Sequence, residues 1–287
     1  MKPATCHDTP RHRGAETGGL GASLARGVAI CALVIVAMSI GAGAQGPPGG
    51  RGAAPPKSAR EAAPVDLTGY WVSVVTEDWR WRMVTPARGD FAGVPLNASA
   101  RKLGLAWDPA RDEAEGNRCK AYGAPAIMRV PGRLHITWRD DNTLQIEADA
   151  GTQTRLLHFG TPPPNTMEPT WQGHSVAQWE GVVRGAGPPD FTPIALNPRE
   201  GTQGRSLEVV TTHLRPGYLR KNGVPYGSRT TLREYIALSR ERNGDTWFVV
   251  TTIVEDPEHL TTPFVTSTNF RKQADATGWA PSPCTVR

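Results

Sequence analysis

The segment TEDWRWRM (residues 76–83) gathers two tryptophans, two arginines and two acids into eight positions. Guanidinium groups bind carboxylates and phosphates through paired hydrogen bonds, and indole rings attract cations, so these residues suit an anionic or aromatic ligand. If the segment continues the strand before it, its tryptophans share one face and its arginines the other. The alternative is structural, with the tryptophans in the core and the arginines paired with acids outside. The candidate ligand-binding residues are Trp79, Arg80, Trp81 and Arg82.

A second basic cluster lies in HLRPGYLRKNGVPYG (residues 213–227). The pairs Pro216-Gly217 and Asn222-Gly223 are typical of turns. Two tyrosines stand among the cations, so this tight loop is a candidate lid or rim for an anionic ligand. The alternative is a solvated connection. The candidate ligand-binding residues here are Arg215, Tyr218, Arg220 and Tyr226.

The stretch MEPTWQGHSVAQWE (residues 167–180) carries one histidine between two glutamates. A histidine and carboxylates on a loop that enters a barrel can exchange protons near neutral pH. No G-x-S-x-G motif, phosphate loop or dinucleotide fingerprint accompanies them in the sequence, so we expect no cofactor. The candidate catalytic residues are His174, Glu168, Glu180 and His213.

The histidine spacing predicts no metal site. No two histidines of residues 65–287 stand at i, i+2 or i, i+4, which are local spacings of metal ligands. The alternative is a site assembled by the fold from His135, His158 and His213 on neighbouring strands. Glu255-Asp256-Pro257 ends a predicted strand, and we interpret it as a turn because Asp-Pro initiates turns.

Residues 1–64 precede the predicted fold. Residues 27–43 form an apolar run of 17, with arginines before it and the small residues Ala42-Gly43-Ala44 at its end. This pattern is typical of a secretory signal peptide, here residues 1–44, and the alternative is a single membrane anchor. Residues 45–64, rich in Pro, Gly and Ala, are predicted to be a disordered linker, and residues 65–287 a single β-rich domain.

The charge balance argues against one class of partner. The formal net charge is +5, and the predicted signal peptide contributes +2 of it through Lys2, three arginines and two acids. The remaining +3 is too weak to indicate nucleic-acid binding. We therefore expect a small-molecule ligand or substrate, no nucleic acid and, if the signal is cleaved, no stable membrane anchor. The oligomeric state stays open.

Two cysteines follow the predicted signal peptide. Cys119 and Cys284 form an even pair in a chain expected in the bacterial periplasm or outside the cell, which predicts a disulfide. The closed loop is long, so an unstrained bond stabilises the fold by about 4 kcal/mol.

Alternating apolar and polar residues dominate from residue 133 onward. Consecutive hairpins in one domain favour a lipocalin-like up-and-down barrel or a strongly curved sheet, because closure removes exposed edges. A β-sandwich is the alternative. A helix is predicted at 98–107, capped by Asn97, and a helical turn within 123–129. The predicted strands are 67–76, 134–139, 144–149, 152–159, 175–180, 206–214, 230–240, 246–255 and 263–272.

Five segments together resemble an exported bacterial family that is common in proteobacteria and acidobacteria. The segments are DLTGYWVS at Asp66, CKAYGAPAIMRVPGRLHI at Cys119, GHSVAQWEG at Gly173, TTHLRPGYLRKNGVPY at Thr211 and VEDPEHLTTPF at Val254. Members often carry a WEG-type turn followed by a valine-rich strand, and a late V-E-D-P. Here a Gly- and Pro-rich excursion, residues 182–204, follows the WEG turn instead. The resemblance implies export and a β-rich, lipocalin-like shape, and it supplies no catalytic residues.

Three functions follow as hypotheses. The first is an exported barrel that binds an amphipathic or anionic small molecule. The second is a cofactor-free lyase, isomerase or hydrolase in which His174 or His213 is the base, Glu168 or Glu180 its acid partner, and arginines hold the developing charge. The third is an envelope structural or interaction protein, tethered by residues 45–64 if the signal stays attached.

Overall fold

The computed structural model describes residues 57–164, 166–180 and 206–286. All of them belong to one compact unit, Ala54–Arg287. The predicted signal peptide, most of the predicted linker and the excursion at 182–204 lie outside the described residues. No helix in the described part of the chain is long and apolar enough to cross a membrane.

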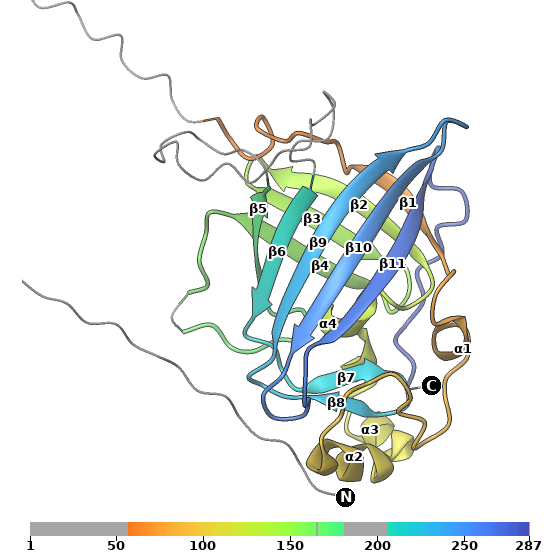
Figure 1. The fold of residues 1–287 in the computed structure, drawn as a ribbon. Helices are drawn as coiled ribbons and strands as arrows, with labels where there is room; N and C mark the ends of the chain where they lie inside the picture. Colours follow the sequence, from red (N-terminus) through yellow and green to blue (C-terminus); the bar gives the residue numbers. More distant parts are fainter. Residues whose placement is uncertain (1–56, 165, 181–205, 287) are drawn as a thin grey trace, which may run out of the picture. The chain divides into compact units, whose positions relative to one another are not determined.

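Nine strands close into a barrel (Figure 1) in the order β1-β11-β10-β9-β6-β5-β4-β3-β2. Closure is made by β1, which pairs with both β11 and β2. The predicted closed, mainly antiparallel barrel is therefore confirmed, and the sandwich is wrong. The strands are β1 (Gly69–Val74), β2 (Arg133–Asp140), β3 (Thr143–Ala148), β4 (Gln153–Phe159), β5 (His174–Trp179), β6 (Ser206–Thr212), β9 (Thr231–Arg240), β10 (Thr246–Glu255) and β11 (Phe264–Gln273).

The up-and-down order is broken in two places. Strands β4 and β5 pair in parallel, because the Pro-rich loop between them returns the chain to the end where β4 began. Parallel neighbours need such a crossover, whereas a two-residue turn joins only antiparallel ones. Between β6 and β9, the chain forms β7 (Gly217–Arg220) and β8 (Val224–Tyr226), a hairpin outside the barrel sheet. The prediction for residues 213–227 was a loop, either a rim for a ligand or a solvated connection, and it did not include these two strands.

The barrel interior is filled by side chains. Trp71, Phe248 and Phe270 are at most 1% exposed and contact one another, with ring centroids 5.3 and 4.9 Å apart. Beside them, Arg155 on β4 donates to both carboxylate oxygens of Glu234 on β9, at 3.1 and 2.7 Å. Since β5 and β6 lie between these strands in the sheet, the ion pair bridges the interior.

The remaining elements gather at one end of the barrel (Figure 1), and we call them the cap. They are α1 (Trp79–Arg82), α2 (Ala98–Leu105), α3 (Pro109–Ala114), the 3-10 turn η1 (Lys120–Tyr122), α4 (Ala124–Ile127) and the β7–β8 hairpin. The cap has a second apolar core, centred on buried side chains such as Phe91, Leu219 and Phe264. Cys119 is bonded to Cys284 as predicted, which ties the C-terminus to the cap.

The prediction that TEDWRWRM extends the first strand is wrong. Strand β1 ends at Val74, and Asp78 takes a left-handed conformation (φ 52°) that starts the helix α1 instead. A helix places neighbouring tryptophans on different faces. Trp79 is consequently 65% exposed rather than packed inward, whereas Arg82 is buried.

Two boundaries also differ from the prediction. The helix predicted at 98–107 ends earlier, at Leu105, and Asp108 caps a further helix, α3, by accepting from the Ala110 amide at 3.0 Å. The described structure also includes residues 57–64 of the predicted linker, where Ser58 and Glu61 form reciprocal hydrogen bonds at 3.2 and 3.1 Å. The adjacent Ala59 carbonyl accepts from the Trp179 indole at 3.0 Å.

Candidate functional site

The structure brings only some of the predicted acid–base residues close together. His174 begins β5, where its Nε2 contacts the Thr161 carbonyl at 3.1 Å and its ring stacks on His158 at 4.7 Å. Burial, and then the neighbouring His174, lower the pKa of His158. Glu180 follows the other end of β5, about 20 Å along the strand, where it accepts from Ser206.

Of the other two predicted catalytic residues, His213 lies beside His174, because the preceding residue Thr212 pairs with His174 across β5 and β6. Glu168 is exposed in the loop before β5. His213 follows β6 in a left-handed conformation (φ 56°), and its Nδ1 contacts the Thr212 hydroxyl at 2.9 Å.

A pocket of about 410 Å³ lies in the cap between α2, α3, the β7–β8 hairpin and the turn after β10. We call it the hairpin pocket. Two predicted ligand-binding residues, Tyr218 and Tyr226, line it. Its wall is partly apolar and partly polar. Further lining residues are Trp107, Asp112, Lys120, Pro225, Glu258 and His259.

One side of the hairpin pocket is organised by Asp112, which is buried. Its Oδ2 accepts from the Tyr218 hydroxyl at 2.7 Å and from the Trp107 indole at 3.1 Å. Its Oδ1 accepts from Lys120 Nζ at 2.6 Å. Burial, and then the bond to Asp112, raise the pKa of Tyr218. Tyr218 is therefore held as a neutral phenol.

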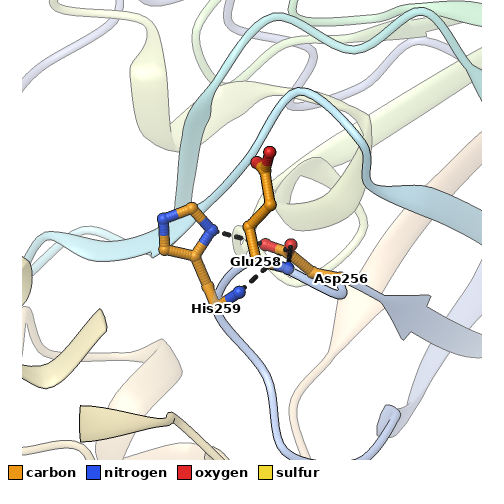
Figure 2. Close-up of side chains that lie close together, drawn as sticks. All are labelled: Asp256, Glu258 and His259. Atoms are coloured by element: carbon orange, nitrogen blue, oxygen red, sulfur yellow. Dashed lines mark hydrogen bonds and ion pairs between the residues drawn. The ribbon is translucent and has the colours of Figure 1, made fainter. Parts of the chain in front are cut away.

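The other side of the pocket contains a buried aspartate that holds a histidine (Figure 2). Asp256 Oδ1 accepts from the backbone amides of Glu258 and His259, at 2.8 and 3.2 Å. Its Oδ2 accepts from the Gly227 amide at 2.8 Å and contacts His259 Nδ1 at 2.9 Å. Because both oxygens already act as acceptors, Nδ1 must be the donor in this contact.

This hydrogen bond leaves the lone pair of a neutral His259 on Nε2. The His259 side chain is 15% exposed and lines the hairpin pocket. No hydrogen bond to Nε2 is made by any residue that the structure describes. An imidazole oriented by a carboxylate, with its second nitrogen open to a pocket, is the arrangement of a general base.

Asp256, Glu258 and His259 also bring potential metal ligands within 4.8 Å of one another. The donor set fits a metal poorly. Four N–H groups already occupy the Asp256 oxygens, and Glu258 Oε1 accepts from Arg229 at 2.9 Å. The cluster therefore fits a hydrogen-bonded turn that orients His259 better than a metal centre.

Three predicted ligand-binding residues, Trp81, Arg82 and Arg220, form a separate group in the cap with Arg129. Arg82 pairs with Glu77 and donates to the Arg129 carbonyl at 3.0 Å. We call Arg82, Arg129 and Arg220 the arginine cluster.

The remaining predicted ligand-binding residues lie outside both groups. Trp79 is exposed, and Arg80 pairs with Asp90 at 2.9 Å. Arg215 lies 4.7 Å from the Trp171 ring centroid and donates to Asn117 at 3.4 Å.

Sequence reasoning missed the central residues of the hairpin pocket. Asp256 and His259 stand three apart across an Asp-Pro turn, and this spacing was a usable signal for a carboxylate–histidine pair. The hydrogen bond from Tyr218 to Asp112 joins residues that are 106 positions apart in the sequence, so no local sequence pattern predicts it.

The comparisons with known proteins return no relatives. No protein-family model matches the chain, and no curated protein matches it. No solved structure matches it either. The resemblance to an exported bacterial family thus stays a prediction.

Proposed function

We propose that this β-barrel protein binds an amphipathic small molecule, and that the ligand lies in the hairpin pocket of the cap. The volume of about 410 Å³ falls in the usual range for small-molecule sites, roughly 300–1,000 Å³. Trp107 and Pro225 supply apolar contacts, and Tyr218 and His259 supply polar ones. This mixture of walls suits a ligand with one apolar and one hydrogen-bonding end.

The observation that carries the proposal is the fixed orientation of His259. Asp256 satisfies its own carboxylate with four N–H groups and thereby holds the imidazole with Nε2 available. A polar atom positioned by buried hydrogen bonds is what gives a pocket specificity. The barrel interior is a poorer location for a ligand, because Trp71, Phe248, Phe270 and the ion pair fill it.

The same pair supports a second candidate, a cofactor-free enzyme that transfers a proton. In this function His259 replaces His174 and His213 as the base, and Asp256 orients it and stabilises the imidazolium that forms. The Tyr218 hydroxyl donates its proton to Asp112, so toward a substrate it can act only as an acceptor. In an isomerisation that balances with these residues, His259 Nε2 takes a proton from one atom of the substrate and returns it to another, which regenerates the neutral imidazole.

Export remains part of the proposal. It is supported by the predicted signal peptide and by the Cys119–Cys284 disulfide, since disulfides persist in oxidising compartments. N-terminal sequencing of the protein from an exporting host tests it. A mature chain that begins near residue 45 is expected. An intact Met1 on protein recovered from the cytoplasm alone would contradict export, whereas an intact Met1 on exported protein would show that the signal stays attached.

Ligand binding is tested by native mass spectrometry of the exported protein against a library of amphipathic metabolites. We expect stoichiometric adducts with the wild type and at least ~10-fold weaker binding in His259→Asn, since a hydrogen bond to a charged or polar anchor contributes roughly 1.5 kcal/mol. The matched control is His135→Asn on β2, a residue that does not line the hairpin pocket, and this variant should bind normally. Equal binding by all three proteins would contradict the assignment of the pocket.

The proton-transfer candidate is separated from simple binding by turnover. If His259 is the base, His259→Asn lowers kcat by about 10²–10⁴. Ligands that bind stoichiometrically without being changed by the wild type would leave binding alone as the function.

A further inference from the structure

Three buried arginines meet in the cap, at a cavity separate from the hairpin pocket. Arg82 ends α1, Arg129 follows α4, and Arg220 ends β7; they are 8%, 6% and 5% exposed. Together with Trp81 and Lys221 they line a cavity of about 40 Å³. None of the residues that line this cavity lines the hairpin pocket.

Aromatic rings hold two of the guanidinium groups. The Arg129 and Arg220 guanidinium carbons lie 5.7 and 5.9 Å from the Phe264 centroid. The Arg220 group also lies 5.0 Å from the Trp81 ring. Ring faces stabilise these cations without neutralising them, so the arrangement concentrates positive charge at the cavity.

Acidic residues balance only part of this charge. Arg82 pairs with Glu77, and Arg129 with Asp78 at 2.8 Å. Among the described residues no carboxylate pairs with Arg220, whose guanidinium donates to the Ala92 carbonyl at 2.7 Å. Burial, and then Arg129, lower the pKa of Arg220 to about 10. At neutral pH Arg220 is therefore still a cation.

Two buried donors of the cluster also lack partners. Arg129 Nη1 and Arg220 Nε make no hydrogen bond to any residue that the structure describes. A buried charged group without a counter-ion and without full hydrogen bonding is strongly unfavourable. A group that supplies both negative charge and acceptor oxygens would remove both deficits at once.

We propose that the arginine cluster binds a small inorganic oxyanion of the phosphate or sulfate class, at a site distinct from the hairpin pocket. Planar guanidinium forks match the oxygens of such anions. A single water needs about 10–15 Å³, so a cavity of about 40 Å³ takes a small ion rather than an organic ligand.

The test uses the full exported chain with inorganic phosphate, then sulfate, against chloride at matched ionic strength. We expect a saturable rise in Tm with each oxyanion and a saturable heat of phosphate binding by calorimetry. Arg220→Met should abolish both. The matched control is Arg215→Met, which removes an exposed arginine stacked on Trp171 and should respond as the wild type does.

A second variant keeps the test decisive if Arg220→Met fails to fold. Arg220→Lys keeps a positive charge at this position but loses the guanidinium fork, and should weaken phosphate binding several-fold. If the wild type responds to phosphate and sulfate as it does to chloride, water alone fills the cavity and the proposal is overturned. The proposal is also overturned if the variants respond to phosphate as the wild type does. His259→Asn should bind phosphate normally, so this result does not depend on the hairpin pocket.

Discussion

Arg155 in the barrel and Arg220 in the cap are buried alike, at 2% and 5% exposure, yet their surroundings differ. Arg155 donates to both oxygens of Glu234, and Ser175 and Thr211 lie beside the pair. Arg220 has aromatic rings and one backbone carbonyl. A buried cation that is paired with a carboxylate has a structural role. A buried cation without a carboxylate can instead bind an anionic ligand.

The same contrast separates the barrel from the cap. The barrel strands reach ten residues and form continuous ladders, so their interior closes over apolar side chains. The cap is built from helices of four to eight residues and a short hairpin. Such short elements leave gaps where they pack against one another, and both cavities that we assign to ligands lie between them.

The largest effect is expected from breaking the Arg155–Glu234 ion pair in the barrel. Glu234→Gln leaves Arg155 buried without a counter-ion, so the free energy of unfolding should fall by about 3–5 kcal/mol. Urea denaturation measures it. The control is Glu113→Gln, whose partner Arg118 is 56% exposed; it should change stability by at most about 1 kcal/mol. Equal losses would mean that the buried pair is no more important than a surface one.

The disulfide should have the next largest effect. Cys284→Ser opens a bond that spans 165 residues, and the loss of unfolding free energy should be about 2–5 kcal/mol. Thermal denaturation with and without reductant checks it. The wild type should become less stable on reduction, while Cys284→Ser should not respond; a response in the variant would point to another reducible group.

Two tyrosines on the β7–β8 hairpin give a matched pair with a smaller effect. Tyr218 donates to Asp112, whereas the buried Tyr226 hydroxyl has no partner among the described residues. Tyr218→Phe should therefore cost about 1.5–3 kcal/mol, and Tyr226→Phe should be neutral or stabilising. Chemical denaturation of both variants decides, and the reverse order would contradict the hydrogen-bond network of the pocket.

Alkaline pH provides the smallest effect. Burial and Asp112 raise the pKa of Tyr218, whereas an unfolded tyrosine ionises near pH 10. The contribution of Tyr218 to stability is full below about pH 10 and is lost as the pH rises further. Unfolding free energies between about pH 9 and 11 should fall less steeply in Tyr218→Phe than in the wild type. Parallel curves would exclude Tyr218 as a contributor.

The sequence predicted the barrel much better than the cap, for a physical reason. Alternation in segments such as 246–255 is a local signal, and the observed β10 has the same bounds. The cap depends on contacts between distant residues, such as Tyr218 with Asp112 and Arg129 with Asp78. Arg82 and Arg220 were identified by type as anion ligands, but nothing local showed that Arg129 would join them.

The most direct test of the hairpin pocket is the tautomer of His259, measured by long-range ¹⁵N NMR on the imidazole in its neutral form. We predict a proton on Nδ1 and an unprotonated Nε2, because Asp256 Oδ2 accepts from Nδ1 at 2.9 Å. Asp256→Asn should remove this preference. A proton on Nε2 in the wild type would contradict the assignment of His259 as the oriented base of the pocket.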